Sequence, residues 1–533
     1  MRSIWPRPLD RLRARARVAG ATRSLAPRRP PHYPPPDVGL TIDRDHFEES
    51  DYARFAGRLR DGLAALRATL ARPGFGEGPA TIGAELELAL VDVRARPLPL
   101  AREVLARTLD PRLTFELDRF NLECNGRPLR LAGRPFTALA RELASALAEV
   151  RRAAAPLGGR AVAVGILPTL RLGDLERGAM TDLARYRALS AGIRRLRHAP
   201  FSVRIAGDDP LEVTCDDVTL EGANTSLQLH LRVAPREFAR THAAAQIASA
   251  PALAAAANAP LFLGHRLWEE TRIALFKQAV DERSEPAGDW RPPARVSFGH
   301  GWCREGALEL FAESVALHAP LLPVVGPEDP LEAERAGRAP RLDELRLHHG
   351  TVWRWNRAVY DPEGGGHLRL ELRALPAGPT VTDMAANAAF LLGLTLGLAP
   401  RAEALLPSFP FEHAHRNFYR AAQHGLDAQL LWPAEEPPSP RPVRAGELVA
   451  GLLEIAREGL VAAGVEEDEA AHHLAVVDER VRSGRTGARW QRLALAAHER
   501  RGEPRDAALA ALVEDYLRNA ASEAPVHRWP EPA

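Results

Sequence analysis

The sequence predicts an α+β protein whose centre is a mainly antiparallel sheet with helices against one of its faces. Strand-like and helix-like segments interleave at irregular spacing, whereas a βαβ series would alternate regularly. Three strand-like segments, 81–92, 226–233 and 367–374, alternate between apolar and polar residues. Such alternation is typical of antiparallel strands with one polar face, because parallel strands covered on both faces read as continuous apolar runs. Helical periodicity dominates after residue 446, so we expect a helical C-terminal region.

The expected elements follow each other along the chain. Helices are expected at 47–71, 135–156, 235–257 and 381–399, where apolar residues recur with helical spacing. Strands are expected at 81–92, 112–126 (as one strand or two), 159–169, 223–235, 295–302 and 367–374. The tail adds helices at 446–463, 467–482 and 504–520, with Gly464 and Gly484 as stops.

These elements divide the chain into three parts. Residues 1–40 hold nine arginines against Asp10 and Asp37 and end in a proline-rich stretch, so we expect a disordered tail there. An organellar transit peptide is the alternative for this stretch, which lacks the apolar core of a secretory signal. A catalytic α+β domain is expected over 41–432, and a helical extension packed on that domain over 433–533.

The composition argues against several classes of function. A formal net charge of +1 over 533 residues lacks the basic excess of most nucleic-acid-binding proteins, so we expect no nucleic-acid partner. Lys277 is the only lysine, and the sequence has no GxxxxGK[ST] phosphate loop. Cys124, Cys215 and Cys303 stand far apart without a CxxC pair, which favours the reducing cytoplasm. No run of about 18 apolar residues indicates a membrane span, and the oligomeric state stays open.

Carboxylates, an imidazole and arginines occupy the polar face of the strand-like segments. Side chains two residues apart in a strand point to the same face. The polar sets are Glu85 and Glu87; Glu116 with Asp118 and Glu123 with Asn125; Ser226, Gln228, His230 and Arg232; and His367, Arg369, Glu371 and Arg373. Adjacent carboxylates are unfavourable unless positive charge lies between them.

Two interpretations fit this polar face. A solvated outer face is the simpler interpretation for any single strand, but such faces usually carry Thr, Lys and mixed charge. Four strands that present Glu, His and Arg together favour a binding site, because carboxylates bind hard divalent cations and arginines bind phosphate. Carboxylate-bound Mg²⁺ can bridge nucleotide phosphates, and arginines can stabilise the charge that develops in phosphoryl transfer. The polar face therefore predicts a site for Mg²⁺ and phosphate.

An ordered set of segments resembles the plant- and bacterial-type glutamate–cysteine ligase family, also called carboxylate–amine ligases, of the glutamine-synthetase-like fold. Between residues 80 and 491 these segments are TIGAELELALVD, NTSLQLHLRV, ANAPLFLG, HHGTVWRWNR, HLRLELRALPAGPT, RNFYRAAQHGLDA and RSGRTGARWQ. The resemblance implies an antiparallel sheet curved into a funnel, two or three Mg²⁺ ions, and ATP as a co-substrate.

The resemblance also implies roles for individual residues. The implied metal ligands are Glu85, Glu87, Glu116 or Glu123, His230 and Glu371. The implied nucleotide-binding residues are His230, Gln228 and Arg369, and the implied catalytic residues are Arg373 and Arg357. Asn258 and Arg416 are weaker candidates on the substrate side. Gln228 stands where the family often has a second histidine, and Asn356 stands where it often has an acid.

The reaction implied by the resemblance joins glutamate to an amine. ATP would phosphorylate the side-chain carboxylate of glutamate, and the amine, most simply that of cysteine, would displace phosphate to form an amide. Two alternatives stay open. One is a guanidino-group phosphotransferase of related fold, since an arginine-lined sheet would suit it equally. The other is a catalytically inactive relative that acts as a binding or scaffold protein.

Overall fold

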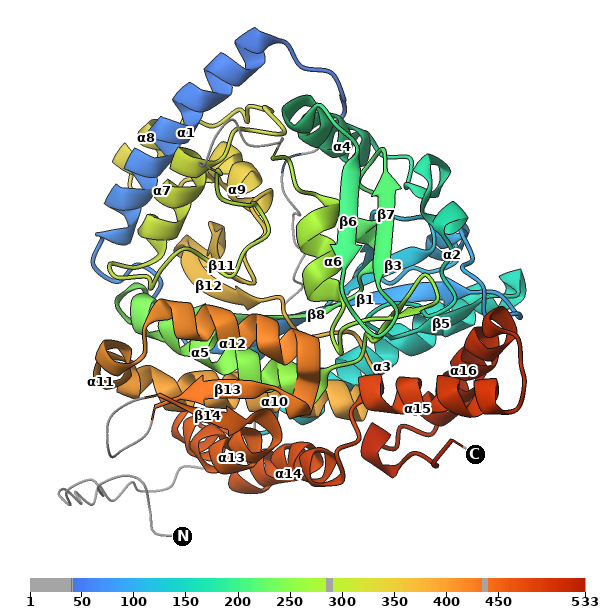
Figure 1. Cartoon of the computed structure of the whole chain (residues 1–533). Coiled ribbons are helices and arrows are strands. Elements are labelled where there is room, and N and C mark those ends of the chain that lie inside the picture. Colours follow the sequence, from blue (N-terminus) through green and yellow to red (C-terminus); the bar gives the residue numbers. More distant parts are fainter. Residues whose placement is uncertain (1–39, 41, 284–290, 434–439, 533) are drawn as a thin grey trace, which may run out of the picture.

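The computed structural model of the protein describes residues 40, 42–283, 291–433 and 440–532 (Figure 1). The tail predicted over 1–40 lies outside the described residues, except for Leu40. A central sheet separates a lower layer of helices from an upper layer of helices and one β-hairpin in this view.

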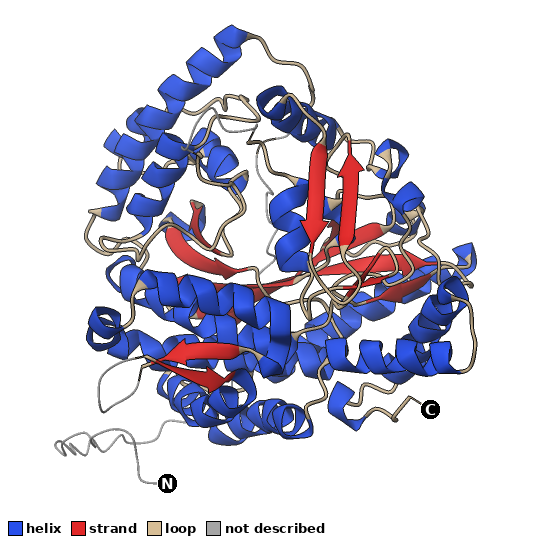
Figure 2. Ribbon diagram, in the orientation of Figure 1, coloured by secondary structure: helices blue, strands red, loops and turns tan. Residues whose placement is uncertain are grey.

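The central sheet has eight strands, and every strand pair in it is antiparallel. Six strands are hydrogen-bonded side by side in the order β11 (Asn356–Asp361), β12 (His367–Leu372), β8 (Leu227–Val233), β1 (Thr81–Val91), β3 (Asn121–Asn125) and β2 (Leu113–Phe115). The short strands β4 (Leu129–Arg130) and β5 (Arg160–Val162) pair with the two ends of β1. Figure 2 shows that the sheet bends upward where β11 and β12 lie. The predicted α+β class and antiparallel sheet are confirmed, and the segment 112–126 forms two strands.

The apolar face of the sheet rests on helices. Ala84, Leu86 and Leu88 of β1 are at most 2% exposed and belong to the main hydrophobic core. Helices α3 (Pro135–Ala154), α5 (Phe238–Ala256) and α10 (Val381–Leu398) lie below the sheet (Figure 1). Almost every side chain of α5 and α10 is buried, so their Ala- and Leu-rich sequences form core rather than surface.

The C-terminal region is helical, as the sequence predicts, and its helices extend the lower layer (Figure 1). They are α13 (Ala445–Ala462), α14 (Glu467–Ser483), α15 (Gly487–Arg500) and α16 (Arg505–Ala520). α13 crosses α10 closely, because a Cβ atom on Gly459 would lie only 2.3 Å from the carbonyl oxygen of Gly393. α14 ends at Gly484, whose left-handed backbone (φ 66°) gives the predicted stop.

One apolar segment passes the length and composition test for a membrane span, which the sequence analysis did not expect. It is Val381–Ser408, and 83% of its most apolar window is buried within the protein. The core helices of soluble proteins commonly pass this test. In this segment the buried polar residues Asp383 and Asn387 bond to Arg480 of α14, which ties α10 into the core.

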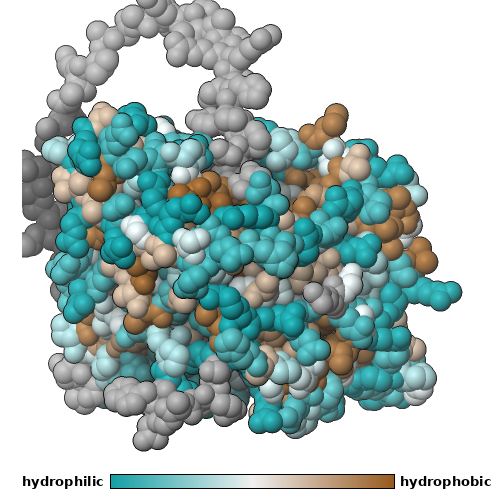
Figure 3. Space-filling model, turned by 90° about the horizontal axis from the view of Figure 1, so that it is seen from above, coloured by the Kyte–Doolittle hydropathy of each residue, from teal (hydrophilic) through white to brown (hydrophobic). Residues whose placement is uncertain are grey.

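Several elements of the chain were not predicted. Those above the sheet are α4 (Ala184–Arg197), α6 (Arg272–Ala279), α7 (Ala307–Leu317), α9 (Asp343–Gly350) and the hairpin of β6 (Phe201–Ile205) and β7 (Leu211–Cys215). The predicted helix α1 (Glu49–Leu70) lies on the same side of the sheet. The unpredicted elements elsewhere are β11, α12 (Phe411–His424) and α15. Viewed from above, hydrophilic residues dominate this side of the molecule, with hydrophobic residues in small groups (Figure 3).

The strand predicted at 295–302 is wrong. Within this segment only Ser297 makes a β-bridge, to Arg354. Its apolar residue Phe298 stacks on Phe418 of α12 with ring centroids 4.7 Å apart, so the segment buries its side chains among aromatic rings instead of joining a sheet. Gly299, at a φ of 112°, turns the chain away immediately afterwards.

The buried ion pair between α14 and α10 predicts a large loss of stability when it is broken. Arg480 is 1% exposed and lies 2.7 Å from Asp383. Arg480→Met leaves that carboxylate buried without a cation, so we expect the free energy of unfolding to fall by about 3–5 kcal/mol in denaturant titrations. Arg482→Met, which removes a surface pair with Asp478 on the same helix, is the control and should change stability by at most about 0.5 kcal/mol. Equal effects of both variants would contradict the structural role of Arg480.

Candidate active site

Strand register brings the predicted residues together on the upper face of the sheet. The registers pair Glu85 with Gln228, Glu87 with Glu123, His230 with Glu371, and Arg357 with Glu371. Opposed residues of neighbouring strands lie on one face. The polar sets predicted from separate strands therefore form one continuous polar surface, which extends from β11 to β3.

Three carboxylates gather at the β1–β3 end of this surface. One oxygen atom each of Glu87, Glu116 and Glu123 lies within 4.8 Å of the other two. Glu87 and Glu123 come from the paired strands, and Glu116 follows the last residue of β2. Burial, and next the charge of Glu116, raise the pKa of Glu87 to about 7. Burial and the charges of neighbouring glutamates raise the pKa of Glu123 well above its usual value.

This carboxylate trio (Glu87, Glu116 and Glu123) fits a divalent cation. Oxygen ligands that share one Mg²⁺ or Ca²⁺ ion lie about 3–5 Å apart, as these do. Neutral donors orient the trio without supplying charge: the Ser226 amide and Gln228 Nε2 donate to Glu87 at 2.7 and 2.8 Å, and Asn125 Nδ2 donates to Glu123 at 2.7 Å. A cation would supply the missing positive charge, and both of the alternatives Glu116 and Glu123 are placed to contact it.

Glu85 forms a separate pair with His230. Its Oε1 lies 2.9 Å from Nε2 of His230. Burial opposes the ionised form of Glu85, but the charge and hydrogen bond of His230 outweigh burial and hold the pKa of Glu85 below its usual value. The second ring nitrogen of His230, Nδ1, is buried and has no hydrogen-bond partner among the described residues. His230 therefore keeps one nitrogen for a ligand.

Glu371 is held between two arginines. Its Oε2 accepts from Arg357 at 2.7 Å, and its Oε1 accepts from Nη1 of Arg373, which also donates to Gln228. Burial opposes ionisation of Glu371, but Arg357 and Arg373 shift its pKa far below the usual value. In this arrangement Glu371 orients both predicted catalytic arginines, and its role as a metal ligand stays a prediction.

The other predicted residues lie further from the carboxylates. Arg369 is on the same face of β12 and lies 3.4 Å from Asp361 at the end of the sheet. Asn258 is completely buried and bonds to Gln491 and Tyr516 of the C-terminal helices, which is a structural position. Arg416 pairs with Glu412 on the exposed face of α12.

Two charged residues of the site were not predicted from the sequence. Arg272, at the start of α6, is buried, donates to the carbonyl oxygens of Ala374 and Leu375, and lowers the pKa of Glu87 by its charge. Glu221 lies in the turn before β8, where burial, then Glu116 and Glu87, raise its pKa well above the usual value. Neither belongs to an alternating segment, so the period-two pattern gave no signal for them.

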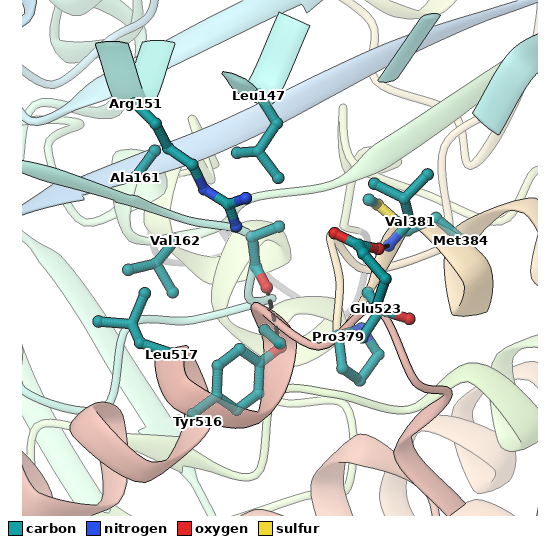
Figure 4. Close-up of a pocket in the computed structure, with 13 residues that line it drawn as sticks. Leu147, Arg151, Ala161, Val162, Pro379, Val381, Met384, Tyr516, Leu517 and Glu523 are labelled. Carbon is teal, nitrogen blue, oxygen red and sulfur yellow. Dashed lines mark hydrogen bonds between the residues drawn. The ribbon is translucent and has the colours of Figure 1, made fainter. Parts of the chain in front are cut away.

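Two cavities lie away from these residues. One, of about 10 Å³, lies where α3, α10 and α16 meet, with Arg151 and Glu523 among its lining residues (Figure 4). This volume corresponds to about one water molecule. The other, of about 820 Å³, lies beside β2 between α4 and α2 (Ala101–Leu105), with Phe115 and Arg119 in its wall. Neither cavity is lined by the carboxylate trio.

An antiparallel sheet that presents a carboxylate trio, a histidine and a pair of arginines on one face is a candidate centre for metal-dependent chemistry on an anionic substrate. The chain belongs to glutamate-cysteine ligase family 2 (GCS2), whose sequence model matches residues 81–297 and 316–515. The matched regions contain every strand of the central sheet. The family resemblance found in the sequence is confirmed, and the chain is of the carboxylate–amine ligase class.

Similar solved structures include two enzymes with related names. A glutamate–cysteine ligase from Francisella tularensis, in complex with AMP, has 10% identity and a TM-score of 0.49, with 84% of this chain and 90% of that chain covered. A bifunctional glutathione synthetase from Pasteurella multocida has 12% identity and a TM-score of 0.44, with 88% of this chain and 55% of that chain covered. No curated protein sequence matches the chain. The family assignment therefore rests on the family model.

The raised pKa of Glu87 predicts how the metal-free protein responds to pH. The folded-state pKa of about 7 lies above the ordinary value of 4.5, so this group's contribution to stability is present below pH 4.5 and is lost as pH rises through 7. Glu87→Gln removes the ionisable group. From pH 5 to pH 8, the wild type should therefore lose about 2 kcal/mol of unfolding free energy relative to this variant.

Magnesium ions should reverse this loss. In thermal melts at pH 8, we expect Mg²⁺ to raise the melting temperature of the wild type by several degrees, and by less at pH 5.5, where protons compete for the carboxylates. Glu87→Gln should show a much smaller Mg²⁺ effect at both pH values. A Mg²⁺ effect that is independent of pH and unchanged in Glu87→Gln would contradict cation binding by the trio.

Proposed function

We propose that this protein is an ATP- and Mg²⁺-dependent ligase that joins the side-chain carboxylate of glutamate to an amine, with cysteine as the favoured amine, through an acyl phosphate. The observation that carries the proposal is the carboxylate trio beside the Glu371–Arg373–Arg357 cluster, on one sheet face of a GCS2 family member. The family description supports glutamate and cysteine as substrates.

The trio would hold Mg²⁺ in this reaction. Glu87, Glu116 and Glu123 would supply three carboxylate oxygens to the ion, which would also take phosphate oxygens and water as ligands. When bound, Mg²⁺ neutralises phosphate charge and orients the triphosphate for transfer. Ser226 and Gln228 keep the oxygens of Glu87 directed, so the site is largely organised before any ligand enters.

The arginines would bind the transferring group. Arg373 uses Nη1 for Glu371 and Gln228, and its Nε and Nη2, which donate to no other described residue, would bind an anion. Arg357 is fixed by Glu371 and by the carbonyl oxygen of Gly350. Two guanidinium groups held by one carboxylate would stabilise the charge that spreads over the phosphoryl oxygens without rearranging.

The chemistry has two displacement steps. In the first, a carboxylate oxygen of glutamate attacks the γ-phosphorus of ATP, the bond to the bridging oxygen breaks, and ADP leaves. In the second, the amine nitrogen attacks the carbonyl carbon of the acyl phosphate, inorganic phosphate leaves, and the nitrogen loses its proton. We also place the protein in the cytoplasm, which the three unpaired cysteines, Cys124, Cys215 and Cys303, support.

An amine-dependent ATPase assay tests the proposal. The protein is incubated with ATP, Mg²⁺, glutamate and a panel of amino acids and amines, while free phosphate and products are measured. We expect phosphate release that requires both glutamate and an amine, with equimolar amide, and the highest rate with cysteine. Glu87→Gln and Arg373→Gln should each lower kcat by roughly 10²–10³-fold, because each removes charge that acts on the transferring group.

A matched variant separates these effects from general damage. Glu212→Gln alters an exposed pair with Arg204 on the β6–β7 hairpin and should keep wild-type activity. A phosphorylated guanidine without free phosphate would identify a phosphotransferase instead. Absence of both nucleotide binding and turnover would sink the ligase proposal and favour a scaffold protein.

A further inference from the structure

In the described part of the chain, nearly all of the least exposed carboxylates, a set that does not include the trio, have a cationic partner. Among the described residues, those with a partner are Asp51, Glu270, Asp343, Glu344, Glu371, Asp383 and Glu469, each of which lies within 4.0 Å of an arginine or histidine nitrogen. Asp118 and Asp217 are buried to the same degree, and no ion pair in this part of the chain includes them. A buried charge without a partner is strongly unfavourable.

The side chain of Asp118 also lacks hydrogen bonds to the described residues. Its side chain is completely buried, and neither carboxylate oxygen has a partner among the described groups. Asn121, three residues later and 2% exposed, repeats the pattern: its Nδ2 donates to the carbonyl oxygen of Gly222 at 2.7 Å, while its Oδ1 has no partner within the same described set. These unsatisfied atoms are all oxygen acceptors, so a donor or a cation is missing here.

Three segments of the chain meet at these oxygens. Asp118 lies in the connection from β2 to β3, and Asn121 is the first residue of β3. The turn before β8 packs directly against them, since a Cβ atom on Gly222 would lie 2.4 Å from Oδ2 of Asp118. Asp217 follows β7. It belongs to the same turn as Gly222, because its Oδ1 accepts from the amide of Thr219 at 3.0 Å and the carbonyl oxygen of Thr219 accepts from the amide of Gly222 at 3.1 Å.

We propose that Asp118, Asp217 and Asn121 form a second cation site, distinct from the carboxylate trio, that takes a hard divalent cation such as Ca²⁺ or Mg²⁺. Carboxylate and amide oxygens are the ligands that such cations prefer, and two carboxylates balance one divalent charge. Asp217 uses Oδ1 for the amide and hydroxyl of Thr219, at 3.0 and 2.6 Å, which fixes its side chain. Its Oδ2 makes no hydrogen bond to the described residues and would be the atom that binds the ion.

The site would position one member of the trio. Asp118 is two residues from Glu116, and Asp217 is two residues from the end of the β6–β7 hairpin. A cation between them clamps the hairpin to the connection that carries Glu116. Its loss should therefore loosen Glu116 and weaken cation binding at the trio, without any change in the trio's own chemistry.

Metal analysis of a protein with a disabled trio tests this proposal. Glu87→Gln/Glu123→Gln is freed of metal, dialysed against CaCl₂ or MgCl₂, and analysed for bound metal and melting temperature. We expect one bound equivalent and a melting temperature several degrees above that of the metal-free protein. Bound metal at or below background in both salts would overturn the proposal, whatever the behaviour of further variants.

Two explanations account for a buried Asp118 without a partner: a bound cation, or a protonated and uncharged carboxyl group. Substitution of Asp118 distinguishes them. Asp118→Asn in the same background should lower cation affinity at least tenfold and remove the melting-temperature shift. Gly222→Ala, which crowds the Asp118 carboxylate without changing charge, should weaken binding in the same direction. Asp216→Asn, at the exposed neighbour of Asp217, is the control and should leave affinity unchanged. An Asp118→Asn protein that is as stable as its parent, with the same metal content, would show that Asp118 is neutral and the site absent.

Discussion

The concentration of like charge on one face of a largely buried sheet is the constraint on which the rest of this structure depends. Among the described residues, basic side chains contact these carboxylates directly at one end only. There, His230 lies 2.9 Å from Glu85, and Arg357 and Arg373 form ion pairs with Glu371. At the other end, the carboxylate trio receives hydrogen bonds from neutral groups alone. A cation from outside the chain would therefore lower the electrostatic energy most at the trio. An anion would do so at the neighbouring arginines Arg357 and Arg373.

Such an arrangement requires a rigid base, because small displacements change the distances between charges and hence the energies. The opposite face of the sheet provides the base through helix α3 and the almost wholly buried helices α5 and α10. The close crossing of α10 and α13, made possible by Gly393 and Gly459, joins the C-terminal helices to the helices under the sheet. The buried pair Arg480–Asp383 adds a charged connection at the same interface. The C-terminal region therefore supports the site without contributing a residue to the trio.

The sequence was informative wherever one face of an element differs chemically from the other. Alternation alone located β1, β8 and β12 and placed Glu85, Glu87, His230 and Glu371 on one face. Alternation does not predict the distances between side chains. The pattern therefore could not show that Glu116 and Glu123 both approach Glu87, or that Glu371 lies between two arginines.

The residues that were missed lie in elements without a clear period. Arg272 begins an eight-residue helix that is buried on most sides, so its polar and apolar faces do not separate. The hairpin of β6 and β7 did carry an alternating signal, with Val203 and Val213 buried between exposed neighbours, but each strand has only five residues. The segment 295–302 shows the opposite failure, because β-forming residues packed on aromatic rings instead of pairing.

The strand order has a consequence for the newly synthesised chain. β1, β2 and β3 lie next to one another in sequence, so Glu87, Glu116 and Glu123 leave the ribosome together, about 250 residues before Arg373. The acidic half of the sheet must therefore exist for many seconds without the basic half. During that interval the only cationic side chains near it are those of its own segment, such as Arg112, which pairs with Asp110. A cation bound by Glu87, Glu116 and Glu123 would therefore aid the folding of the sheet as well as the chemistry proposed above.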